Sequence, residues 1–160
     1  MKKLIAFVMA ALVCLTLCSC KLGKSKTSAP ETETQAYFYV YVAPTTNNGD
    51  AVNIYTVDLN EVEVTEGAFS VLKYLQAEYE LTFEYSDSEY GAFLTAVGNV
   101  RPSAANEFVL IYTTYEADFS LPPYDTKVSI GAVTFTAAGV GASSMTVSAG
   151  NAMLITLGSY

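Results

Sequence analysis

The sequence predicts an α+β fold in which a single helix packs on one face of a mainly antiparallel sheet. Apolar side chains recur at spacings of three and four residues in one segment only, at about residues 66–80. Elsewhere they alternate with polar residues or form short runs bounded by turn residues, which is typical of strands. The cysteines all precede residue 21, so the folded part has no disulfide and depends on its apolar core.

The first half of the folded part is expected to be a hairpin followed by the helix. Strands are predicted at residues 37–42 and 53–59, with the turn-rich segment 44–51 between them. Thr65 is the expected N-cap of the helix, because a hydroxyl can accept a hydrogen bond from the first free backbone N–H groups. Alternation within the first strand places three rings on one face, those of Tyr37, Tyr39 and Tyr41.

The second half is expected to consist of further strands. They are predicted at residues 81–85, 90–97, 108–112, 128–135, 144–148 and 153–157, with 86–89 as a loop. Residues 108–112 are a continuous apolar run, which favours a central strand buried on both faces. Gly131 interrupts its strand, and Gly150-Asn151 is expected to join the last two strands as a hairpin.

Residues 1–20 carry the features of an export signal. Lys2 and Lys3 precede an apolar run that is too short to span a bilayer, and Leu17-Cys18-Ser19-Cys20 ends it. The ending resembles the bacterial lipobox. This resemblance implies that residues 1–19 are a signal peptide and that Cys20 is lipidated and holds the protein at the membrane. The alternative is an ordinary secretory signal that happens to contain cysteine.

The lipobox also divides the rest of the chain. Residues 20–35 are the lipidated cysteine and a polar tether that is expected to be disordered, and residues 36–160 are one globular domain. The domain is expected to face outward from the cell membrane, in an extracellular or a periplasmic space. The sequence leaves open whether the host has one membrane or two.

Composition excludes several classes of function. After residue 30 the chain has three basic residues and all 16 acidic ones, a net charge of −13, so no nucleic acid partner is expected. Histidine is absent, which excludes Ser-His-Asp and Cys-His catalysis and zinc sites that use histidine. The acidic turns 47–50 and 87–89 lack the alternating spacing of a calcium loop, so no metal is expected.

One short pattern suggests an enzyme. Ser70 to Lys73 match the S-x-x-K of penicillin-binding proteins and class A β-lactamases. The chain has no K-T-G and is about half the length that such a fold needs. We therefore predict that the protein is not an enzyme.

Four stretches together resemble a known family. They are Thr65–Leu72, Tyr90–Val100, Val109–Tyr112 and Gly139–Ser143 leading to Gly150-Asn151. Residues 50–158 are similar to the transcobalamin-C-terminal-like domain, the DUF4430 family. The resemblance implies a β-grasp-like fold. It also makes a corrinoid one candidate ligand, because the best-known members cover one side of cobalamin.

Tyrosines are the candidate binding residues, because a broad ring with a polar tip suits a half-exposed contact surface. The candidates are Tyr37, Tyr39, Tyr41, Tyr112 and Tyr115. The alternative is that these rings cover the sheet under the helix. The predicted function is a non-catalytic domain that binds a small molecule or an envelope protein. A corrinoid-binding surface protein and a cell-surface adhesion module are the alternatives.

Overall fold

The computed structural model describes residues 36–46, 51–89 and 91–160. They belong to one compact unit, Thr34–Tyr160. The predicted signal peptide, the lipidated Cys20 and the tether lie outside the described residues.

The larger of two sheets has six strands in the order β2-β1-β8-β5-β7-β6. Its strands are β1 (Tyr37–Val42), β2 (Asn53–Asp58), β5 (Glu107–Thr113), β6 (Lys127–Ile130), β7 (Val133–Ala137) and β8 (Ala152–Ser159). Strands β1 and β8 run parallel, and every other neighbouring pair is antiparallel. The smaller sheet pairs β3 (Phe83–Ser88) with β4 (Gly91–Val97).

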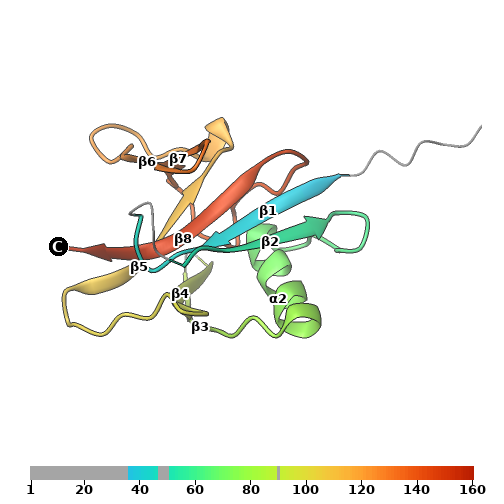
Figure 1. The fold of residues 1–160 in the computed structure, drawn as a ribbon, viewed down its shortest axis with the longest axis horizontal. Helices are drawn as coiled ribbons and strands as arrows, with labels where there is room; N and C mark the ends of the chain where they lie inside the picture. Colours follow the sequence, from blue (N-terminus) through green and yellow to red (C-terminus); the bar gives the residue numbers. More distant parts are fainter. Residues whose placement is uncertain (1–35, 47–50, 90) are drawn as a thin grey trace, which may run out of the picture. The chain divides into compact units, whose positions relative to one another are not determined.

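One α-helix, α2 (Gly67–Tyr79), completes the described part together with a 3₁₀ turn, η1 (Glu116–Asp118). The predicted α+β class is therefore confirmed. In Figure 1 the helix lies on one side of the large sheet, and the β6–β7 hairpin forms the end of that sheet farthest from β2.

The main core lies between α2 and the large sheet. Phe38, Val40 and Val42 of β1 point into it and are fully buried, as the alternation in this strand predicts. The helix contributes Phe69, Leu72 and other residues of its apolar face. Burial of each such side chain contributes about 1.5–3 kcal/mol, which holds the helix on the sheet.

A second core covers the opposite face of the sheet. Phe135 of β7 and Leu154 of β8 are fully buried there, and the ring of Tyr41 packs edge-on against Phe135 at 5.1 Å between centroids. Because both faces are covered, β8 is buried over most of its length.

The start of the helix differs from the prediction. Thr65 is not the N-cap; that position is Glu66, and it makes no side-chain capping hydrogen bond. The hydroxyl of Ser70 instead accepts hydrogen bonds from the backbone N–H groups of Thr65 and Glu66, at 3.1 and 2.9 Å. A buried serine inside the helix thus satisfies two donors just before the first turn, whereas the Ala68 and Phe69 N–H groups that a capping residue would have taken donate to the Met145 and Ala142 carbonyls.

The predicted strand at residues 144–148, and the hairpin that would join it to the last strand, are wrong. The Met145 carbonyl accepts the N–H of Ala68 at 3.2 Å, and the Thr146 N–H donates to the Asp118 carboxylate at 2.6 Å. The backbone groups of residues 145 and 146 are thus hydrogen-bonded to the start of the helix and to η1, not to a neighbouring strand. Strand β8 pairs instead with β1 and β5.

The segment 86–89 is also not a loop over its whole length. Strand β3 continues to Ser88, whose hydroxyl donates to the Gly91 carbonyl at 2.7 Å. Gly131, where an interruption was predicted, lies between β6 and β7 with a φ of 59° and so turns the chain back on itself.

Candidate ligand-binding groove

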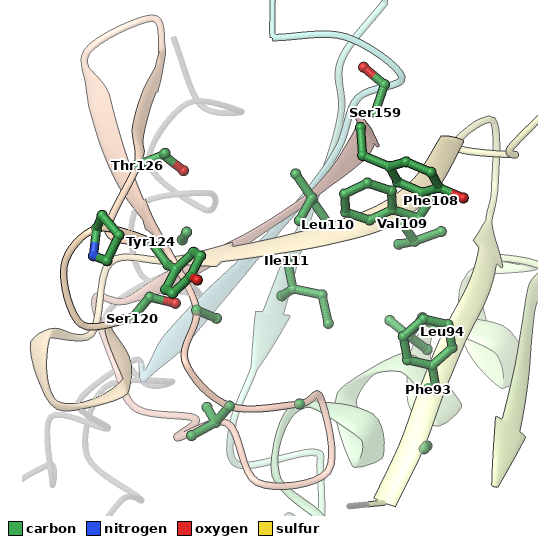
Figure 2. A pocket seen from close by; sticks show the side chains of 17 residues that line it. Phe93, Leu94, Phe108, Val109, Leu110, Ile111, Ser120, Tyr124, Thr126 and Ser159 are labelled. Atoms are coloured by element: carbon green, nitrogen blue, oxygen red, sulfur yellow. The ribbon is translucent and has the colours of Figure 1, made fainter. Parts of the chain in front are cut away.

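An apolar groove of about 760 Å³ opens beside the first part of β5. This volume is in the range of small-molecule sites, roughly 300–1,000 Å³. Residues 108–111 of β5 lie along it, and Figure 2 shows Phe93 and Leu94 of β4 on one side with Tyr124 and Thr126 on the other. We call this hollow the β5 groove. Five parts of the chain build it, within residues 92–94, 108–111, 120–126, 137–141 and 159–160.

Aromatic side chains mark the border of the β5 groove. Phe93 is 57% exposed, Tyr124 is 75% exposed and Tyr160 is 86% exposed, and all three line it. The ring of Tyr160 stacks on that of Phe108 at 5.9 Å between centroids. Large exposed apolar side chains gathered around one hollow are typical of an interaction site.

The β5 groove continues into a more polar hollow of about 560 Å³. The two share Val140 and Gly141 as lining residues. The polar hollow is lined by Glu89 and Ser143, and the Ser143 hydroxyl accepts the backbone N–H of Ala92 at 3.0 Å. One end of the groove therefore presents a carboxylate and hydroxyl groups.

Glu107 fixes the turn from which β5 begins. Its carboxylate accepts the backbone N–H groups of Ser103 and Ala104 at 2.7 and 3.1 Å, and the Ser103 hydroxyl at 3.0 Å. These hydrogen bonds, the one from the Ser103 N–H first, favour the charged carboxylate and lower the pKa of Glu107. The charged form holds the turn next to Phe108 in place.

The five tyrosines predicted from sequence do not line the β5 groove. Tyr39 and Tyr41 are half-buried against the second core, and Tyr112 lies within that core at 6% exposed. Tyr37 is partly exposed at the start of β1, and Tyr115 is partly exposed directly before η1. The structure thus brings three of the rings together as packing for the sheet.

The Ser70–Lys73 pattern has a structural use. Ser70 is 8% exposed, and its oxygen accepts hydrogen bonds at the start of the helix. Lys73 forms an ion pair with Glu66 and lies over the Phe69 ring at 4.6 Å from the centroid. The lysine is therefore engaged with groups other than the serine hydroxyl.

The described ranges contain neither a candidate metal site nor a helix that could cross a membrane. In residues 36–46, 51–89 and 91–160, no three His, Cys, Asp or Glu side chains are grouped so that they could hold a metal ion. Within those same ranges no helix has the length and apolar character needed to cross a bilayer.

No family model matches the chain, and no curated protein matches it. Among solved structures it is similar to the crystal structure of "a putative metal binding protein" from Ruminococcus gnavus. The two are 19% identical with a TM-score of 0.43, and the match covers 79% of this chain and 99% of the other.

Most residues that border the groove carry no signal in the sequence. Phe93, Phe108 and Tyr160 lie in strands or at a strand end, where an apolar ring is ordinarily part of the core. Tyr124 carried a usable signal, because an aromatic residue directly after Pro122-Pro123 belongs to an exposed loop.

Proposed function

We propose that this chain is an outward-facing lipoprotein, anchored to the cell membrane through Cys20, whose domain binds a ligand without catalysis in the β5 groove. The observation that carries the binding role is the apolar groove with Phe93, Tyr124 and Tyr160 exposed around it. The anchor rests on the lipobox pattern, with Ser19 directly before Cys20.

The strand order supports a β-grasp-like arrangement and, with it, the transcobalamin-C-terminal-like family. A hairpin (β1–β2) is followed by the helix, and the last strand β8 inserts parallel to β1 and antiparallel to β5. On this proposal the β3–β4 hairpin is an insertion before β5, and it supplies one wall of the groove.

The neutral apolar dye Nile red tests the groove. The fluorescence of Nile red should rise when the dye binds the Cys20→Ser protein, which is prepared without detergent. Phe93→Ser should weaken binding about tenfold, because it removes a large ring from the wall. The matched control is Ile54→Ser, which removes a side chain of similar exposure, 53%, from β2 outside the groove. Equal loss in both variants would overturn the groove as the binding site.

The anchor is tested by expressing the full chain in a bacterial host and partitioning it between detergent and water. The wild-type protein should enter the detergent phase, because two acyl chains bind far more firmly than one. Cys20→Ser should move to the aqueous phase or remain as the longer precursor. Cys18→Ser is the control and should stay anchored, since Cys18 follows Leu17 and fits the lipobox poorly. A Cys20→Ser protein of unchanged mass in the detergent phase would contradict the proposal.

A further inference from the structure

Strand β5 has an unpaired edge where it borders the groove. On one side it pairs with β8 along its whole length, from Glu107 to Thr113. On the other side the only ladder partner in the described part is β7, which pairs with just Tyr112 and Thr113. Residues 108–110 therefore have one edge without a neighbouring strand.

Hydrogen bonds at both ends of this stretch show which residues face the open edge. The Glu107 N–H donates to the Ala104 carbonyl at 3.0 Å, and the Ile111 carbonyl accepts the Ala138 N–H at 2.9 Å, so both point away from β8. Backbone groups of alternate residues in an antiparallel strand face the same side. The N–H and C=O of Val109, midway between them, thus face the open edge and border the groove.

An unpaired strand edge beside apolar walls is the arrangement that binds extended peptides by adding a strand. Backbone hydrogen bonds supply affinity, and hollows for alternate side chains supply specificity. Here Phe93 on one wall and Tyr124 on the other offer exposed apolar contacts on either side of the Val109 edge. A strand edge left open in this way also has free hydrogen-bonding groups to satisfy.

The charge of the domain selects the kind of peptide. Glu89 lines the polar end of the groove, and Asp125 lies between two groove residues. Among the bases after residue 30, Lys73 and Arg101 are each paired with a glutamate. The acidic surface therefore favours a positively charged partner.

We propose that the β5 groove binds an extended peptide that carries basic and apolar side chains at alternate positions and adds as a strand beside Val109. This inference rests on the proposed groove-binding function and names its ligand class. A second copy of this chain is disfavoured as the occupant, because two domains of the same strong negative charge repel each other.

The probe is the synthetic peptide acetyl-Lys-Phe-Lys-Val-Lys-Phe-Lys-amide, titrated into the Cys20→Ser chain at low salt. A counterpart with glutamate in place of lysine tests charge. Two N-methylated isomers of the peptide keep every side chain and test backbone pairing. Alternate N–H groups of an extended strand face opposite edges, so one isomer is methylated on the N–H groups of one edge and the other on those of the opposite edge. Phe93→Ser and its control Ile54→Ser test the place of binding.

The parent peptide should bind, and the glutamate peptide should bind at least tenfold more weakly. One of the two N-methylated isomers should also bind at least tenfold more weakly than the parent peptide. Phe93→Ser should weaken binding, and Ile54→Ser should leave it unchanged. Equal binding of both N-methylated isomers and the parent, or no binding at all, would overturn strand addition. Nile red binding that depends on Phe93 would then still support the groove itself.

Amide hydrogen exchange provides the direct readout. Saturating peptide should slow exchange of the Val109 amide at least tenfold and leave the Leu110 amide unchanged, because Leu110 faces β8. An unchanged Val109 amide would contradict the proposal. Protection of Val109 that grows with protein concentration in the absence of peptide would contradict it too, because a second copy would then occupy the edge.

Discussion

Two buried threonines show what a single hydroxyl group contributes to the stability of this domain, because one hydroxyl has a hydrogen-bond partner and the other has none in the described part of the chain. Thr113 and Thr156 are both 1% exposed. The Thr113 hydroxyl accepts the N–H of Tyr115 at 3.0 Å, whereas the Thr156 hydroxyl has no hydrogen-bond partner within the described residues. A buried polar group without a partner costs about 1–3 kcal/mol, so the second hydroxyl weakens the fold.

Thr156→Val should therefore raise the free energy of unfolding by about 1 kcal/mol, because valine keeps the shape and removes the unpaired hydroxyl. Thr113→Val should lower it by about 1–2 kcal/mol, because the Tyr115 N–H loses its acceptor. Urea unfolding of the two variants measures both changes. A Thr156→Val protein as unstable as Thr113→Val would show that the Thr156 hydroxyl is satisfied.

The helix and the segment that follows β7 depend on each other. Carbonyls of Ala142 and Met145 accept the N–H groups of Phe69 and Ala68, so residues 142–145 cap a helix that lies far away in sequence. Gly67 lies at this contact with a φ of 52°. A Cβ there would lie 2.6 Å from the Met145 carbonyl oxygen, a clash with backbone that cannot easily move.

Gly67→Ala should destabilise the protein by about 3 kcal/mol. Left-handed backbone costs a non-glycine residue about 1–2 kcal/mol, and overpacking adds about 1–3 kcal/mol. Gly131→Ala is the matched control, with a similar φ of 59° and nothing within 4 Å of the added Cβ, so it should cost only about 1–2 kcal/mol. Denaturant unfolding compares them. Equal losses would show that the contact with Met145 is loose.

For the molecule as a whole, the sequence predicted what local periodicity determines and missed what distant contacts determine. The helix and the alternation of β1 were predictable, because each shows a regular apolar spacing. The strand at 144–148 was wrong, because its backbone bonds to the helix start and to Asp118, which no local pattern encodes. The β5 groove arises where separate elements meet, so only its loop residue Tyr124 carried a signal.

Net charge is the other property of the whole molecule. With three bases against 16 acids after residue 30, self-repulsion should lower stability at low ionic strength. Raising NaCl from 10 to 300 mM should therefore raise the melting temperature by about 2–4 °C, as screening weakens the repulsion. The double variant Glu63→Gln/Glu78→Gln, at two exposed sites, should show a smaller rise. Calorimetry measures both, and a fall with salt would contradict the expectation.

The side-by-side placement of β1 and β8 has a consequence for biogenesis. Every element from β2 to β7 must be synthesised before β1 can acquire its parallel neighbour, and pairing over such a sequence distance is slow. A ribosome-bound precursor thus lacks the strand that completes both cores. On the proposed export route, this delay would keep the polypeptide unfolded while it passes through a translocation channel, until it has crossed the membrane.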